Sequence, residues 1–181
     1  MKYLDLLFAA RPMLMLPAWS VFLVGLHYHH RLSGGHFTVT HLLVMLVLSL
    51  LAAGAVYLNQ VYDYESDRVN RKVGFLQNNC LSPRNLLAAS LVTSLLGLGI
   101  AAFVSRQMLI IGAALFLLSW MYSVPPVRLK DRPVGGLVAN GLGCGFLINL
   151  AVMPHMTIHD TGLLGWDNPV YFFLTVGGVY A

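Results

Sequence analysis

The chain has 181 residues, of which 57% are hydrophobic and 10% charged, with a formal net charge of +4 and a mean hydropathy of +0.72. Soluble domains carry about 25% charged residues, so this composition excludes an ordinary soluble protein and predicts one embedded in a lipid bilayer. The apolar stretches lack the two-residue alternation of barrel strands. We therefore expect an all-α, polytopic transmembrane bundle with membrane lipid and no nucleic acid among its partners.

Six apolar segments follow one another along the chain, and a helix needs about 20 apolar residues to cross a bilayer. Five are predicted as complete spans, at residues 13–29, 41–58, 86–104, 108–124 and 134–153. A sixth begins near residue 169 and reaches Ala181 after about 13 residues, too few to cross unaided. The expected fold is a single transmembrane domain over residues 1–181, with five complete spans and an incomplete sixth.

Basic residues gather on one side of this predicted topology. If the N-terminus is cytoplasmic, that side carries Lys2, Arg11, Arg68, Arg71, Lys72, Arg84, Arg128, Lys130 and Arg132, and the other side carries Arg31 and Arg106. Cytoplasmic loops of membrane proteins are enriched in Lys and Arg. We therefore expect a multi-pass protein of the inner, cytoplasmic membrane, with the N-terminus and the connections 59–85 and 125–133 on the cytoplasmic side.

Acidic side chains recur every four residues where the second span ends. On a continuing helix, Asn59, Asp63 and Asp67 fall within an arc of about 80° and about 12 Å of axis, whereas Glu65 lies on another face. Carboxylate and carboxamide oxygens suit Mg²⁺, which completes its shell with water and substrate phosphates. Taken alone, the segment also fits a helix end with ordinary surface charge.

The next cytoplasmic connection is basic. Pro125 and Pro126 end the fourth span, and Arg128, Lys130 and Arg132 follow within six residues. Arg and Lys bind phosphate oxygens and would neutralise a leaving diphosphate. The alternative for this loop alone is an anchor to anionic lipid.

Together, the two segments resemble the UbiA superfamily of intramembrane prenyltransferases. The first matches as N-x-x-x-D-x-x-x-D at Asn59, Asp63 and Asp67, followed by Asn70 and Lys72. The second matches as Tyr122-Ser123-x-Pro-Pro-x-Arg128-x-Lys130-x-Arg132-Pro133, and the Arg11-Pro12 pair is a weaker match.

The resemblance implies a Mg²⁺-dependent prenyltransferase, a transferase of alkyl groups other than methyl, working on an isoprenoid held in an apolar interior. The donor would be a prenyl diphosphate, and the acceptor an aromatic or other hydrophobic molecule of the membrane, such as a quinone precursor. Carried over by position, Asn59, Asp63 and Asp67 correspond to metal ligands, the two aspartates being catalytic. The implied diphosphate contacts are Arg68, Lys72, Tyr122, Arg128, Lys130 and Arg132.

The chain departs from the family in one respect. The family has a second acidic motif, D-x-x-x-D, after its sixth span, whereas Asp160 and Asp167 are seven residues apart and predicted on the opposite side of the membrane. The domain is therefore expected to lack the C-terminal part that carries this motif. A truncated, non-catalytic relative that acts as a membrane binding or scaffold protein is the alternative.

Two further alternatives stay open. CDP-alcohol phosphotransferases also place acidic residues at a helix end, but their motif needs Asp-Gly and Ala-Arg pairs that do not follow Asp63 or Asp67. A transport protein could bind an anion at the charged mouth, although the spans carry no paired charges at mid-membrane. Magnesium-dependent binding of a prenyl diphosphate would discriminate among these classes.

Overall fold

The computed structural model describes residues 2–33 and 37–151, and within these ranges the chain is helical and has no strand. The elements, in chain order, are α1 (Lys2–Ala9), the 3-10 turn η1 (Pro12–Met15), α2 (Leu16–Ser33), α3 (Val39–Val69), α4 (Pro83–Val104), α5 (Arg106–Ser123), the 3-10 turn η2 (Leu129–Asp131), α6 (Pro133–Asn140), the π-helical η3 (Gly141–Leu147) and α7 (Ile148–Leu150). This confirms the expected all-α fold.

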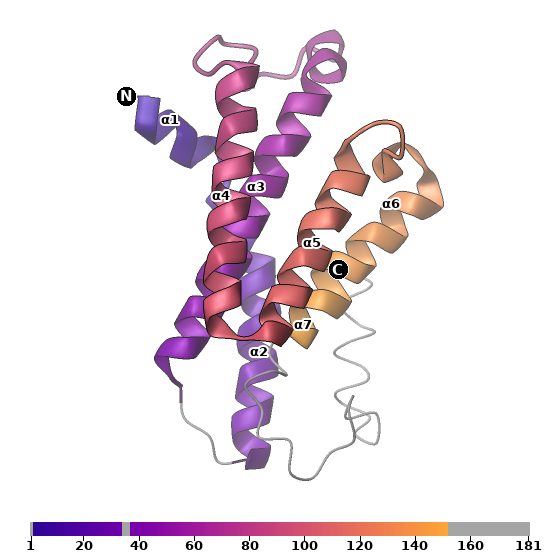
Figure 1. The fold of residues 1–181 in the computed structure, drawn as a ribbon. Coiled ribbons are helices and arrows are strands. Elements are labelled where there is room, and N and C mark those ends of the chain that lie inside the picture. Colours follow the sequence, from indigo (N-terminus) through magenta and orange to yellow (C-terminus); the bar gives the residue numbers. More distant parts are fainter. Residues whose placement is uncertain (1, 34–36, 152–181) are drawn as a thin grey trace.

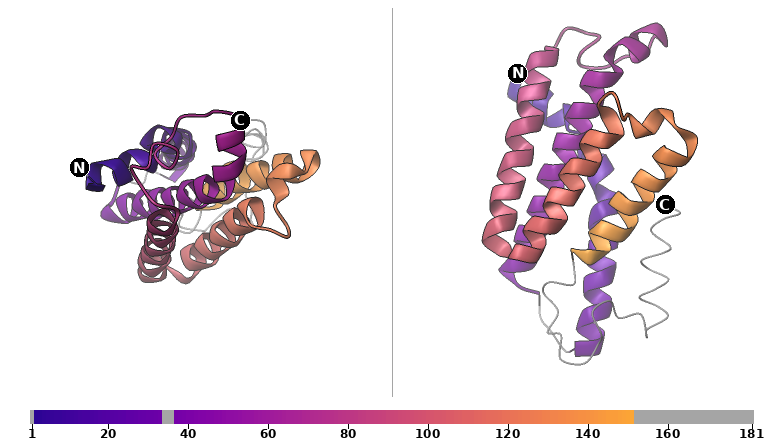
Figure 2. Two further views of the ribbon diagram at one scale, coloured as in Figure 1. Left: turned by 90° about the horizontal axis from the view of Figure 1, so that it is seen from above. Right: turned by 45° about the vertical axis from the view of Figure 1, so that its right-hand side comes forward.

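Helix α3 is the centre of the bundle and, at 31 residues, its longest helix. It packs most extensively against α4 and also contacts α5 (Figures 1 and 2). The α3–α4 connection and the α5–α6 connection lie at the same end of the bundle (Figure 1). The polar segments that follow residues 58 and 124 are therefore neighbours in space, as the topology predicted.

Two apolar clusters hold the helices together. One joins Phe22 of α2 to residues of α3, α4, α5 and the 147–151 region, and the other joins α1 and η1 to α3 and the α3–α4 connection. Helix α1 is also fixed by hydrogen bonds, because Tyr57 Oη donates to Leu6 O (2.8 Å) and Gln60 Nε2 donates to Ala9 O (2.7 Å). The second cluster thus supports the polar end of α3.

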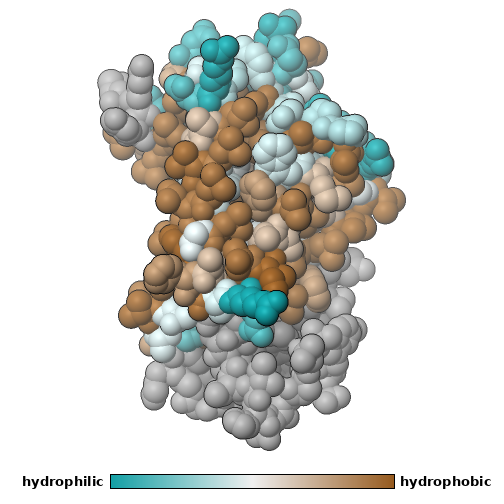
Figure 3. Space-filling model, viewed as in Figure 1, coloured by the Kyte–Doolittle hydropathy of each residue, from teal (hydrophilic) through white to brown (hydrophobic). Residues whose placement is uncertain are grey.

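Within the described ranges, four stretches are long and apolar enough to cross a membrane: α3, α4, α5 and residues Pro133–Leu150. The segment predicted as the first span forms η1 and α2, with a shorter apolar stretch over Pro12–Val24. On α4 the outward side chains are exposed hydrophobic ones, namely Leu91, Val92, Leu95, Leu96 and Phe103. Figure 3 shows hydrophobic side chains across the middle of this face and hydrophilic ones at the end that carries the two connections. The predicted sixth span lies outside the described residues.

The fifth predicted span, residues 134–153, is not a regular α-helix throughout its described part. Over residues 134–151, α6 passes into the π-helical η3 before α7, and Pro133–Leu150 is still long and apolar enough to cross a membrane. In this wider turn, the Gly145 carbonyl oxygen accepts two hydrogen bonds. One comes from Asn149 Nδ2 at 2.9 Å, and the other comes from the backbone N–H of Ile148. Glycines carry no side chain that resists such local rewinding, and π-helical turns are often found at functional sites.

Ser105 ends α4 and starts α5. Its backbone N–H donates to Ala101 O (3.1 Å), and its Oγ accepts from the backbone N–H of Met108 (3.0 Å). An extended residue with a short polar side chain is a favourable N-cap, and without that hydroxyl one N–H of the first turn loses its partner. A one-residue connection between two long helices depends on this dual role.

We expect Ser105→Ala to lower the free energy of unfolding by about 1 kcal/mol, the usual value of an N-cap. The measurement is a denaturation curve in mixed detergent–SDS micelles, followed by helical circular dichroism. Ser20→Ala is the matched control, because the Ser20 hydroxyl donates to the Leu16 carbonyl within a regular helix, and its loss orphans no backbone N–H. Equal curves for the two variants would contradict the capping role.

Candidate active site

The candidate site forms where the polar end of α3 meets the α5–α6 connection. Helix α3 continues past the apolar segment, so Asn59 and Asp63 lie one turn apart on the same face. Helix α5 ends at Ser123 because Val124 is extended and two prolines follow. The chain then turns back, with the Arg128 N–H donating to Val124 O (3.1 Å), and Pro133 starts α6.

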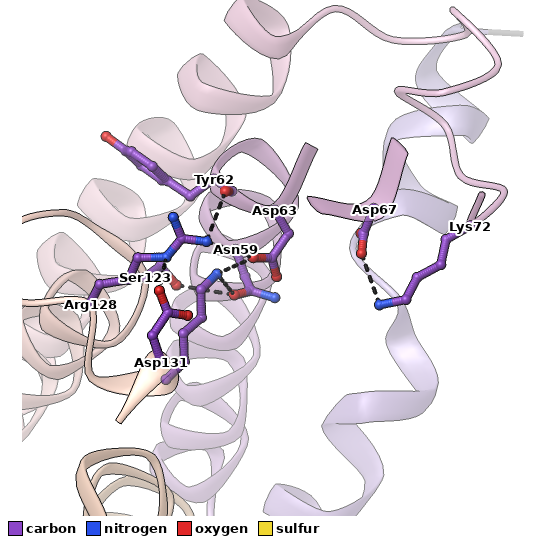
Figure 4. A network of polar contacts seen from close by, with 9 residues as sticks. Asn59, Tyr62, Asp63, Asp67, Lys72, Ser123, Arg128 and Asp131 are labelled. Atoms are coloured by element: carbon purple, nitrogen blue, oxygen red, sulfur yellow. Dashed lines mark hydrogen bonds and ion pairs between the residues drawn. The ribbon is translucent and has the colours of Figure 1, made fainter. Parts of the chain in front are cut away.

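Lys130 occupies the centre of this site. Its Nζ donates to Asn59 Oδ1 at 2.9 Å and forms an ion pair with Asp63 Oδ1. Only 10% of the Lys130 side chain is exposed. Ser123, which is buried, donates from Oγ to the same Asn59 oxygen at 3.3 Å. Figure 4 shows Asn59 and Asp63 directed from α3 toward the connection that carries Arg128 and Asp131.

Arg128 also joins the two segments at Asp63. Its Nη2 lies 3.5 Å from Asp63 Oδ1 and donates to the Tyr62 backbone carbonyl at 3.4 Å. Its Nε is 2.9 Å from Asp131 Oδ2, but the N–H is not aimed at that oxygen, so this contact is an ion pair rather than a directed hydrogen bond. Arg128 has a φ of 38°, a left-handed conformation that costs a non-glycine residue about 1–2 kcal/mol. Strain of this kind is concentrated at functional sites.

Asp67 belongs to a neighbouring group. It lies one turn beyond Asp63 and forms a salt bridge with Lys72, whose Nζ is 2.8 Å from Asp67 Oδ1. Figure 4 shows this pair beside the Asn59–Asp63 group. The hydrogen bond to the Asp67 carboxylate, followed by the charge of that carboxylate, raises the pKa of Lys72. Lys72 is therefore a permanent cation next to the site.

The other predicted contacts are less closely grouped. Arg68 pairs with Glu65 (2.8 Å), and both side chains are largely exposed. Tyr122 is half-buried at the end of α5, and Arg132 is exposed at the start of α6. Two participants, Ser123 and Asp131, were not predicted as site residues. Ser123 stands within the quoted Tyr122–Pro133 motif, and Asp131 follows Arg128 at a one-turn spacing, which are the signals that could have identified them.

The donor set fits a hard divalent cation. Asn59 Oδ1 and Asp63 Oδ1 converge on one positive charge, the Lys130 ammonium, so the fold already provides a position for a cation between two oxygens. Among residues 2–33 and 37–151 there is no cluster of three or more His, Cys, Asp or Glu residues that would form a complete protein cage. Magnesium needs no such cage, since it binds one or two carboxylates and takes its other ligands from water and phosphate.

The described residues thus form an apolar helical bundle that carries acidic and basic side chains in contact at one end. Residues 12–179 match the model of the UbiA prenyltransferase family. The chain belongs to this family, and it is an integral membrane protein.

The chain is 31% identical over 123 residues to a digeranylgeranylglyceryl phosphate synthase of Methanopyrus kandleri, covering 67% of this chain and 44% of that protein. It is 32% identical over 98 residues to the synthase of the same name from Thermococcus gammatolerans, covering 54% of this chain and 34% of that protein. The chain thus spans less than half the length of these curated relatives.

Solved structures share the fold. A UbiA homolog from Archaeoglobus fulgidus bound to GPP and Mg²⁺ superposes with a TM-score of 0.75 at 22% identity, and the match covers 97% of this chain and 60% of that chain. The same homolog bound to DMAPP and Mg²⁺ gives a TM-score of 0.76 at 21% identity, with the same coverage. The expected family and fold are confirmed.

Proposed function

We propose that this chain contributes the first metal-binding half of a prenyltransferase, which transfers a prenyl group from a prenyl diphosphate within the membrane. The observation that carries the proposal is the cation position between Asn59 and Asp63, with Arg128 beside it, at the polar end of an apolar bundle. Magnesium-bound homologs of the same fold support the cofactor.

In this proposal, Asn59 and Asp63 bind Mg²⁺, with Asp67 as a second carboxylate one turn away. Bound Mg²⁺ would supply Lewis-acid stabilisation of the diphosphate as it departs. Arg128 and Lys130 bind oxygens of the same diphosphate, and Arg68, Lys72, Tyr122 and Arg132 lie around it as further contacts. The allylic C–O bond breaks with its electron pair going to the diphosphate. The acceptor then bonds to the allylic carbon and releases a proton.

The charged groups and the apolar interior have separate tasks. Arg128, Lys130 and the α3 carboxylates are confined to the end where the leaving group would lie, whereas the clusters that join α2 to α5 are apolar. An allylic cation has to be kept from water until the acceptor reaches it. This division of the bundle is the one that such a reaction needs.

The test is binding of geranyl diphosphate to the 181-residue chain in lipid nanodiscs, with Mg²⁺ and with EDTA. We expect saturable binding that disappears with EDTA. Binding of equal affinity in Mg²⁺ and in EDTA, or no binding in either, would contradict the proposal. The non-catalytic alternative, a membrane binding protein, predicts the same binding; it differs in predicting no prenyl transfer even when the second metal-binding half is supplied.

For the acceptor, we propose a glyceryl phosphate lipid that already carries one prenyl ether. The support is that both curated relatives are named digeranylgeranylglyceryl phosphate synthases. The experiment offers geranylgeranyl diphosphate with either geranylgeranylglyceryl phosphate or 4-hydroxybenzoate. Product from the glyceryl phosphate alone is expected, and product from the aromatic acid alone would overturn this choice in favour of a quinone precursor.

We also propose that the site faces the cytoplasm, since nine of the eleven basic residues belong to that side of the predicted topology. Cys80 is exposed in the α3–α4 connection, at the end that carries the site. In a Cys144→Ala background, a membrane-impermeant maleimide is expected to label Cys80 in inside-out vesicles and not in right-side-out ones. The reverse pattern would place the site on the outer side.

A further inference from the structure

The cation position described above is already taken by a side chain of the protein. Lys130 Nζ contacts both oxygens that the proposed function assigns to the metal, Asn59 Oδ1 at 2.9 Å and Asp63 Oδ1 in an ion pair. The Lys130 side chain is 10% exposed and reaches Asn59 and Asp63 across 71 and 67 residues of sequence. It is therefore an integral part of the site rather than a surface lysine.

We propose that Lys130 and the metal ion exclude one another at the Asn59–Asp63 oxygens, so that Lys130 blocks metal binding until a diphosphate arrives. The inference rests on the proposed function and adds an order of binding to it. Metal and diphosphate enter together, and the free protein keeps its ligand oxygens neutralised by its own ammonium group.

The first argument is the capacity of the oxygens. A carboxamide oxygen has two lone pairs, and Asn59 Oδ1 already accepts from Lys130 Nζ (2.9 Å) and Ser123 Oγ (3.3 Å). Asp63 Oδ1 likewise faces two cations, Lys130 and Arg128. A metal ion can therefore bind Asn59 Oδ1 only if one of these donors leaves, and the lysine is the charged one.

The second argument is electrostatic. A divalent ion at these oxygens would lie within a few ångströms of the ammonium group, at which distance two positive charges in a partly buried site repel strongly. A diphosphate removes the conflict because it brings several negative oxygens. Lys130 has a flexible four-carbon stem and three donors, so its ammonium can move from the carboxylate to a phosphate oxygen over a short distance.

Arg128 has the opposite property. It is tied to the Tyr62 carbonyl at 3.4 Å and to Asp131 at 2.9 Å as well as to Asp63. These contacts fix its guanidinium next to the site whether or not Asp63 is bound to metal. Lys130, by contrast, contacts Asn59 and Asp63, and both are proposed metal ligands. Lys130 is thus the residue that must move.

The test measures Mn²⁺ affinity of the 181-residue chain in detergent by electron paramagnetic resonance, with and without inorganic diphosphate. For the wild type we expect weak Mn²⁺ binding alone and much tighter binding with diphosphate. For Lys130→Met we expect Mn²⁺ affinity without diphosphate to rise at least about tenfold, while the gain produced by diphosphate shrinks. Diphosphate must raise the affinity for Mn²⁺ by the same factor as Mn²⁺ raises the affinity for diphosphate. Titrating diphosphate at fixed Mn²⁺ therefore measures the same coupling free energy.

Three variants sharpen the result. Lys130→Arg keeps a cation and should keep weak binding of Mn²⁺ alone. Lys130→Gln removes the charge but retains a donor for Asn59, so it should gain Mn²⁺ affinity like Lys130→Met even if the methionine variant folds poorly. Arg84→Met removes a positive charge from an exposed residue at the same end of the bundle and should leave Mn²⁺ affinity unchanged.

The proposal is overturned if the neutral Lys130 variants, folded by circular dichroism, bind Mn²⁺ alone no tighter than the wild type. It is also overturned if Arg84→Met produces the same gain, because the effect would then be one of net charge. Failure of the proposed function looks different: geranyl diphosphate would not bind to the wild type in a Mg²⁺-dependent way at all.

Discussion

Replacing Asp63 with alanine is expected to abolish Mg²⁺-dependent binding and turnover of prenyl diphosphate while leaving the bundle folded. Asp63 is the carboxylate on which Lys130 and Arg128 converge, so its loss removes the negative charge that both cations contact. Removing a residue that only orients a metal ligand typically lowers metal affinity or activity about 10–100-fold, and removing a direct ligand should lower them further. The measurement is geranyl diphosphate affinity at saturating Mg²⁺, together with turnover in a preparation that transfers prenyl groups.

The fold should survive because the remaining charges keep partners. Lys130 retains Asn59, and Arg128 retains Asp131 and the Tyr62 carbonyl. Glu65→Gln is the matched control, since Glu65 is on the same helix two residues away, is 69% exposed and pairs with the largely exposed Arg68. Helical circular dichroism should be equal in both variants. Retained turnover in Asp63→Ala would falsify its role as a metal ligand.

Asp67→Ala is expected to impair transfer as well, for a different reason. Asp67 neutralises Lys72 at 2.8 Å rather than Lys130. Its loss would remove the second carboxylate and at the same time release a cation at the mouth of the site. If the two aspartates act on one metal ion, the double variant should be no worse than Asp63→Ala, since the ligand set is already lost. Additive losses would assign Asp67 to a separate role.

The sequence predicted which residues lie together at this end of the bundle better than it predicted their contacts. The four-residue spacing was enough to place Asn59 and Asp63 on one face of α3. The succession of apolar spans and polar connections was enough to place the basic connection at the same end of the bundle. Both inferences use only helix periodicity and membrane topology. Neither depends on how individual side chains pack.

The insertion of Lys130 between Asn59 and Asp63 could not be read from the sequence. It depends on the path of residues 124–132, where Arg128 adopts a left-handed backbone conformation. Residues other than glycine rarely adopt this conformation. Tertiary contacts with Asp63 and Tyr62 hold Arg128 there. A spacing rule predicts which residues share a helix face, but not the geometry of a connection fixed by another helix.

The packing of α3 against α4 was likewise not predicted, although the sequence contains its signal. Ser90, Ser94 and Gly97 recur at helical spacing on α4, and all three are buried. Ser90 Oγ donates to the Gly54 carbonyl of α3 at 2.7 Å. In lipid, helices associate through small residues that permit close backbone approach, and through hydrogen bonds between helices. Small polar residues in an apolar span therefore mark a contact face.

Gly54→Val is expected to destabilise the packing of α3 against α4. A Cβ at Gly54 would lie 2.2 Å from Ser94 Oγ, 3.1 Å from the Ser90 carbonyl oxygen and 3.2 Å from Thr93 Oγ1. The Ser94 hydroxyl can rotate away, but the Ser90 carbonyl belongs to the α4 backbone and cannot. The helices would have to separate, losing the Ser90–Gly54 hydrogen bond as well. Overpacking of this kind costs about 1–3 kcal/mol or more, measured as the unfolding free energy in mixed micelles.

Gly99→Val provides the matched control, because nothing lies within 4 Å of a Cβ at Gly99 and the position is exposed on the outer side of α4. Both variants add the same β-branched side chain to a long apolar helix, so only the contact with the partner helix differs. Adding Ser94→Ala to Gly54→Val should recover part of the loss, since it removes the nearest atom but not the Ser90 carbonyl. If Gly54→Val and Gly99→Val unfold alike, α3 and α4 do not approach at Gly54, and the support that α4 gives to the helix bearing Asn59 and Asp63 must come from elsewhere.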